Sequence, residues 1–156
     1  MNYLEAITES AQETQKMGQI LAKKIIKSKG KTKKALIIGL TGELGSGKTT
    51  FVQGLAQGLA IKERITSPTF VIFKKFSLSR PAPFKYFYHI DCYRLRGSHD
   101  LIDLGFLEII NQPDNLVIIE WAEKARKILP ANVSWLRFEH LAEDRRRIIY
   151  ENLDSY

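Results

Sequence analysis

The chain has 156 residues, 44% of them hydrophobic and 26% charged, which is the composition of an ordinary globular domain with its own core. The single cysteine, Cys92, excludes an internal disulfide framework, and no apolar run approaches the ~18 residues of a membrane span. The first residues carry acids and lack the layout of a signal peptide, so we expect one cytoplasmic domain spanning residues 1–156.

The first half of the chain predicts two helices with a strand between them. Ser10 and Glu13 have the spacing of a capping box. Apolar residues then recur four apart on one helix face, and the lysines around Gly30 end this helix. Residues 35–40 form an apolar run of strand length, and residues 48–60 are predicted to be helical. The apolar positions on the two helices are Met17, Leu21 and Ile25, then Val52, Leu55 and Leu59.

The second half of the chain predicts further strands and short helices. Residues 70–76 and 84–95 are rich in aromatic and branched residues and flank a proline-containing turn, so they are predicted to form a β-hairpin. The remaining predictions are a helix over 100–110, a buried strand over 116–121, a helix over 122–129 that Pro130 stops, and a closing hairpin of strands 133–140 and 145–151. This order indicates an α/β fold with a mixed parallel and antiparallel sheet flanked by helices.

A glycine-rich segment, Gly42–Thr50, stands between the strand at 35–40 and the following helix. Gly42, Gly47, Lys48 and Thr49 fit the P-loop pattern. Glycines let successive backbone N–H groups turn toward one anion, and the next helix directs its positive end to the same place. Lys48 supplies a charge for the β- and γ-phosphates, and Thr49 supplies a hydroxyl ligand for magnesium. The segment therefore predicts a nucleoside triphosphate site.

Hydrolysis also needs an acid near the magnesium ion, and two candidates end predicted strands. Asp91 lies near the end of an aromatic-rich strand, and Glu120 ends the apolar run that starts at Leu116. Acids at the ends of buried strands are expected at the sheet edge where ligands bind. His89 could order this site or be an ordinary core histidine. Trp121 could pack in the core or shield the site.

The net charge of +7 comes largely from two basic clusters. Residues 23–34 contain seven lysines in twelve positions, and Arg145–Arg147 form the second cluster. Basic surfaces attract phosphate-rich partners, but both clusters could also be solvated faces. The sequence leaves this open.

Several separated segments together resemble the TsaE family, formerly called YjeE. The segments are Gly42–Thr50, Ser67-Pro-Thr-Phe70, His89-Ile-Asp-Cys-Tyr-Arg-Leu95, Asp103-Leu-Gly-Phe106 and Ile118-Ile-Glu-Trp-Ala-Glu-Lys124. The resemblance runs from the first helix to about Pro130. It implies a P-loop NTPase fold and a magnesium-dependent ATPase. The expected role is threonylcarbamoyl modification of adenosine 37 in tRNA, together with TsaD- and TsaB-type proteins that carry out the transfer. Contact with tRNA is expected at least indirectly, through that complex.

The resemblance also implies a role for each site residue. Lys48 and Glu120 are expected to be catalytic, with Glu120 ordering water or metal. Thr49, Asp91 and Glu120 are expected near Mg2+. Ser67–Phe70 is expected to be a switch-like loop in which Thr69 senses the γ-phosphate. The residues expected to line the ATP site are Gly42, Glu43, Leu44, Gly45, Ser46, Gly47, Lys48, Thr49, Thr50 and Thr69.

Two other functions remain open from the sequence. One is a small P-loop kinase for a nucleoside or metabolite, although only Arg94 and Arg96 approach the arginine-rich lid of such enzymes. The other is a nucleotide-dependent adaptor of an RNA-modifying complex, with negligible turnover. A GTPase is less favoured because no Asn-Lys-x-Asp segment is present.

Overall fold

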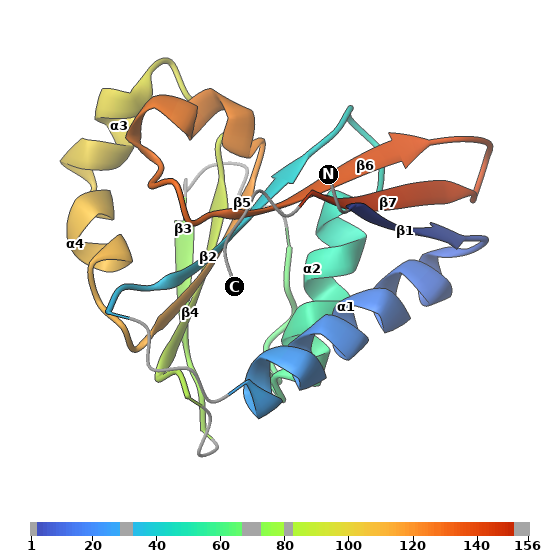
Figure 1. Ribbon diagram of the computed structural model, residues 1–156, viewed down its shortest axis with the longest axis horizontal. Helices are drawn as coiled ribbons and strands as arrows, with labels where there is room; N and C mark the ends of the chain where they lie inside the picture. The colour runs from blue at the N-terminus through green and yellow to red at the C-terminus, as the bar shows by residue number, and fades with distance from the viewer. Residues whose placement is uncertain (1–2, 29–32, 67–72, 80–82, 152–156) are drawn as a thin grey trace.

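A computed structural model describes residues 3–28, 33–66, 73–79 and 83–151 (Figure 1). Its described strands are β1 Tyr3–Thr8, β2 Leu36–Thr41, β3 Phe73–Ser77, β4 Tyr86–Asp91, β5 Asn115–Glu120, β6 Ser134–His140 and β7 Arg146–Glu151. Its described helices are α1 Ala11–Lys27, α2 Lys48–Gly58, α3 Ser98–Asp103, α4 Phe106–Ile110 and the 3-10 helix η1 Ala122–Ile128. No helix in these ranges is long and apolar enough to cross a bilayer.

The described strands form one mixed sheet in the order β1-β7-β6-β2-β5-β4-β3. β2 pairs in parallel with β5 and β6, and β5 pairs in parallel with β4. The β3–β4, β6–β7 and β1–β7 pairs are antiparallel. This confirms the predicted mixed sheet, and β5 is buried along its whole length, as expected of a parallel strand with both faces covered.

The sheet is the middle layer of three. Side chains of β2 alternate between its faces: Ile38 and Leu40 pack in the cluster with α1 and α2, whereas Ile37 packs with α3, α4 and η1. Figure 1 shows α1 and α2 lying together on one side and α3 and α4 on the other. The P-loop residues therefore leave β2 at the centre of the molecule.

Most predicted elements are confirmed, with local differences. Ser10 caps α1 by accepting a hydrogen bond from the Glu13 N–H, at 3.1 Å, and α1 ends at Lys27. The helix predicted over 100–110 is divided into α3 and α4, because Gly105 adopts a left-handed φ of +83°. The segment 122–129 is a 3-10 helix, and β4 ends at Asp91. Strand β1 was not predicted, because its sequence, YLEAIT, lacks a clear alternation.

α1 and α2 approach each other unusually closely through glycines. A Cβ atom added at Gly54 would lie 1.9 Å from the Gln15 carbonyl oxygen, and one at Gly18 would lie 2.3 Å from that of Phe51. Side-chain amides bridge the same two helices, with Gln19 Nε2 2.8 Å from Gln57 Oε1. These contacts fix the position of α2, which begins at the P-loop, against α1.

We expect Gly54→Ala to destabilise the fold by about 1–3 kcal/mol, because the added methyl group overlaps the Gln15 backbone and the helices must separate. The clash opposes the gain of roughly 1 kcal/mol in helix propensity that alanine brings. Urea unfolding of the variant and the parent chain measures this difference. The control is Lys23→Ala on the exposed face of α1, where the change should be small. Equal or higher stability of Gly54→Ala would contradict the close helix contact.

Candidate functional site

The P-loop joins the end of β2 to the start of α2 and depends on glycine backbone angles. Gly42 has a φ of +136° and Gly47, which caps α2, has a φ of +100°. A side chain at Gly42 would also lie 2.4 Å from the Phe138 carbonyl oxygen on β6. Residues with a Cβ rarely adopt these angles, so the loop conformation requires glycine here. This confirms the predicted turn between strand and helix.

Lys48 is buried inside the loop that precedes it. Its Nζ donates hydrogen bonds to the carbonyl oxygens of Gly42 at 2.6 Å and Glu43 at 2.9 Å, and lies 3.3 Å from Ser46 Oγ. Burial lowers the pKa of Lys48 from its ordinary value, while the carboxylates of Glu120, Glu123 and Asp91 oppose this shift. The ammonium group thus braces the loop and brings positive charge to it.

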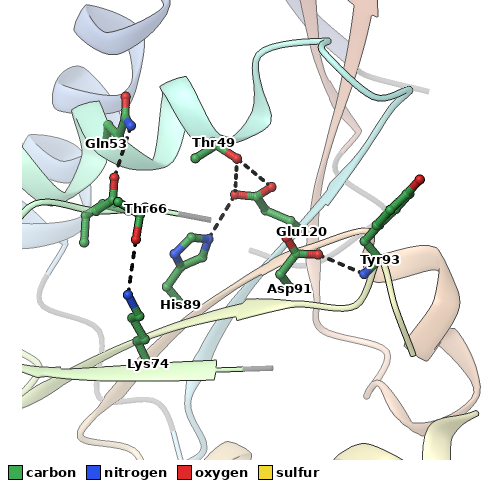
Figure 2. Close-up of polar contacts among 9 residues, drawn as sticks. Thr49, Gln53, Thr66, Lys74, His89, Asp91, Tyr93 and Glu120 are labelled. Atoms are coloured by element: carbon green, nitrogen blue, oxygen red, sulfur yellow. Dashed lines mark hydrogen bonds and ion pairs between the residues drawn. The ribbon is translucent and has the colours of Figure 1, made fainter. Parts of the chain in front are cut away.

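Glu120 is the buried acid that contacts α2. The Thr49 hydroxyl lies 2.9 Å from each Glu120 carboxylate oxygen and donates to one of them, and His89 Nε2 lies 2.9 Å from Glu120 Oε1 (Figure 2). Glu120 and His89 are both almost fully buried. The parallel register that pairs Leu40 with Glu120 places this carboxylate beside the P-loop. The structure therefore joins a predicted acid directly to a predicted metal-binding hydroxyl.

Asp91 lies on the neighbouring strand at the same level, opposite Glu120 in the β4–β5 register. Its Oδ1 accepts a hydrogen bond from the Tyr93 N–H at 2.8 Å, so the turn after β4 orients the carboxylate. Asp91 is half-buried and lines the same cavity as Glu120. The two acids therefore line one cavity but differ in burial: Glu120 is almost fully buried, whereas Asp91 is partly exposed.

Trp121 follows Glu120 at the end of the site that contains the two acids, Asp91 and Glu120, and its backbone is strained. Its φ of +56° is left-handed, which costs a bulky residue on the order of 1–2 kcal/mol. In this conformation its ring lies 4.2 Å from Lys48 Nζ and 4.9 Å from the Tyr93 ring. Lys124 also lies near both aromatic rings. Trp121 also packs against the core cluster on the α3–α4 side of the sheet, so its position fits both roles considered for it, core packing and shielding.

These residues line one cavity of about 590 Å³. Its P-loop wall contains Leu44, Gly45, Ser46, Gly47, Lys48, Thr49 and Thr50. Gly42 and Glu43 contribute through their carbonyl contacts with Lys48. Thr69 lies outside the described residues, as does the whole Ser67–Phe70 segment.

The cavity is also lined by residues that the sequence did not assign to the site, among them Ala11, Thr14, Asp144 and Arg146. Thr14 is held by a 2.8 Å hydrogen bond with Thr8 of β1. Arg146 Nη1 donates to the carbonyl oxygens of Ala142 and Glu143, which fixes the guanidinium at the turn between β6 and β7. The local sequence gives no signal for these positions, because long-range strand pairing brings them to the P-loop.

The two basic clusters occupy different surroundings. Arg145 pairs with Glu9 at 3.2 Å, Arg147 pairs with Glu139 at 3.0 Å, and only Arg146 of that cluster lines the cavity. The described lysines of the first cluster lie at the carboxyl end of α1 and before β2, at the end of the sheet opposite the P-loop. These described lysines therefore do not line the cavity.

The donor atoms at the acid end suit magnesium better than a softer metal. Thr49, Asp91 and Glu120 offer hard oxygen donors, and Mg2+ typically uses one or two carboxylates together with waters and phosphate oxygens. Across the ranges that the structure describes, no group of three or more His, Cys, Asp or Glu side chains is arranged to hold a metal by itself. The residues present thus fit an ion that is shared with a phosphate ligand.

Comparison with known proteins identifies the family. The model of the family "Threonylcarbamoyl adenosine biosynthesis protein TsaE" matches residues 8–148. A Treponema pallidum protein named tRNA threonylcarbamoyladenosine biosynthesis protein TsaE is 32% identical, with the match covering 93% of this chain and 98% of that protein. The Haemophilus influenzae protein of the same name is 36% identical over 64% of this chain and 60% of its own length.

A crystal structure of YdiB from Bacillus subtilis aligns with a TM-score of 0.70 at 27% identity, covering 96% of this chain and 84% of that one. The chain therefore belongs to the TsaE family and has its P-loop NTPase fold.

We expect Cys92, which follows Asp91, to resist thiol reagents in the native protein. Burial, with a smaller contribution from the Asp91 carboxylate, raises its pKa to about 12, so only about one thiol in 10,000 is ionised at pH 8. The rate of reaction with a chromogenic disulfide reagent, with and without denaturant, measures this protection. Full reaction of the native protein within seconds would contradict it.

Proposed function

We propose that this member of the TsaE family is a single-domain, magnesium-dependent ATP hydrolase that acts in tRNA threonylcarbamoyladenosine biosynthesis. The observation that carries the proposal is the contact between Thr49 at the start of α2 and the buried carboxylate of Glu120. A hydroxyl at the first turn after a P-loop and an acid on the adjacent strand are the groups that hold magnesium in this fold.

The cavity has the size that a nucleotide requires. Its volume of about 590 Å³ falls within the range of roughly 300–1,000 Å³ for small-molecule sites. Residues 44–50 would hold the phosphates with backbone N–H groups, Lys48 and the positive end of α2. Thr14 and Arg146, which line the same cavity, would contact the nucleoside. Thr69 remains our candidate for contact with the γ-phosphate, on the basis of the resemblance.

Each acid has a distinct role in the proposed reaction. Bound magnesium would neutralise charge on the transferred phosphoryl group. Thr49, Asp91 and Glu120 would hold the ion, and Glu120 would also order the attacking water. Lys48 would hold the β- and γ-phosphates and stabilise the charge that develops between them. Trp121, beside Lys48, would limit the access of bulk water.

The pathway follows from the names of the relatives, which describe tRNA threonylcarbamoyladenosine biosynthesis. We propose that the chain works with TsaD- and TsaB-type partners, which perform the transfer itself, and that it meets tRNA at least indirectly through them. ATP turnover by this chain would then sustain or reset the complex.

We expect Lys48→Ala to abolish ATP binding, because it removes the buried ammonium group that braces the loop and faces the phosphates. Equilibrium titration with ATP and magnesium measures the loss. Lys127→Ala, an exposed position on η1, is the matched control for one lost positive charge and should bind as the parent does. Unchanged affinity in Lys48→Ala would rule out the phosphate role.

We expect the parent chain to hydrolyse ATP with magnesium, and to do so faster when a TsaD–TsaB pair is added. Glu120→Gln should bind ATP but lose turnover, because it keeps the shape of the side chain and removes its negative charge. The matched control is Glu63→Gln, which changes an exposed acid in the segment that follows α2.

Other results of these turnover measurements would favour one of the two alternative functions, a metabolite kinase or an adaptor. Turnover that is indifferent to the pair, or that appears only with a small hydroxylated acceptor, would favour a metabolite kinase. Full function of Glu120→Gln in tRNA modification would favour an adaptor that needs only nucleotide occupancy.

A further inference from the structure

The polar contacts of the site continue behind Glu120 to His89. This residue lies on β4 with no exposed surface, and its Nε2 is 2.9 Å from Glu120 Oε1. An ionised carboxylate only accepts hydrogen bonds, so the proton between these atoms belongs to Nε2. Figure 2 shows His89 and Thr49 reaching the same carboxylate from different directions. Side chains from α2 and β4 thus meet at the acid that ends β5.

The other nitrogen of the ring distinguishes His89 from a histidine retained for packing. His89 Nδ1 is buried and has no hydrogen-bond partner among the residues that the structure describes. A buried polar atom without a partner costs stability, so an apolar side chain would satisfy packing alone at lower cost. Its neighbour on the same face, Phe87, is such a side chain. The contact of Nε2 with Glu120 is the polar interaction that accounts for a histidine at this position.

The contact also has a specific mechanical effect on Glu120. The carboxylate is held by a hydroxyl on one side and by an imidazole N–H on the other. Without His89, only the Thr49 hydroxyl of these two partners would still hold the Glu120 carboxylate, and the carboxylate could rotate. Residues that orient metal-site groups from behind commonly change metal affinity or activity by roughly 10–100-fold.

We propose that His89 is a positioning residue that fixes the Glu120 carboxylate through its Nε2–H. This role for His89 rests on the proposed ATPase function, because it matters only if Glu120 acts on magnesium or water. His89 is not among the described residues that line the cavity, so its effect would pass through Glu120.

The test compares two amide substitutions of equal polarity. In His89→Gln the terminal N–H can take the place of Nε2, whereas in His89→Asn the amide is shorter and falls near the position of Nδ1. We expect His89→Gln to keep the turnover number and the magnesium dependence within about threefold of the parent. We expect His89→Asn to lose roughly 10–100-fold in turnover, with magnesium-free nucleotide affinity unchanged.

A loss of stability alone should not produce this difference between the Gln and Asn variants in turnover and magnesium dependence. Phe87→Leu is the matched control, because it weakens the core two residues before His89 and leaves the polar contacts in place. It should lower the melting temperature without changing magnesium dependence. Equal behaviour of the Gln and Asn variants in turnover and magnesium dependence, whether both intact or both impaired, would overturn the proposal.

Two further measurements do not depend on turnover. Binding of a non-hydrolysable ATP analogue, titrated with MgCl2, should require more magnesium in His89→Asn than in the parent. Nitrogen NMR of the parent chain, which has three histidines, should show the His89 proton on Nε2. A ring protonated only at Nδ1 would overturn the proposal. Absence of ATP turnover in the parent would sink the hydrolase proposal instead, and the magnesium dependence of analogue binding would still decide the role of His89.

Discussion

The parallel register of β4, β5 and β2 is the constraint on which the site depends. Pairing of Leu40 with Glu120, and of Asp91 with Glu120, brings both acids to the edge where the P-loop starts. Because side chains alternate along a strand, this register also directs Glu120 and His89 to the face that α2 covers. A slip of one residue would place Ile119 where Glu120 stands and would remove the acid from the site.

The contact between α1 and α2 has a comparable role on the other side of the cavity. Glycines at positions 18 and 54 let the two backbones nearly touch, so the first turn of α1 lies beside the first turn of α2. Thr14 thereby reaches the cavity, and its buried bond with Thr8 joins this wall to β1. The edge strand β1 thus helps to shape the site although it contributes none of the lining residues.

The sequence predicted those parts of the site whose signals are local. The P-loop follows from the spacing of Gly42, Gly47 and Lys48, and Glu120 follows from its place at the end of an apolar run. The wall formed by Thr14 and Arg146 could not be predicted, because it depends on pairings between residues far apart in the chain. The break at Gly105 and the left-handed Trp121 depend on single backbone angles that periodicity does not encode.

The arrangement of buried charge bears on whether the protein turns over ATP or only binds it. Burial lowers the pKa of Lys48, and the Glu120 carboxylate is the strongest of the charges that oppose this shift. The Glu120 carboxylate therefore helps to keep Lys48 ionised inside the protein. Nucleotide occupancy alone requires the loop and Lys48. An apolar residue at position 89 would avoid a buried ring nitrogen that has no partner among the residues that the structure describes. The histidine that completes the contacts from Thr49 through Glu120 therefore carries a stability cost, and nucleotide binding does not explain that cost. Hydrolysis does explain it, because hydrolysis needs an oriented carboxylate at magnesium. For this reason we favour hydrolysis over occupancy as the function of the site.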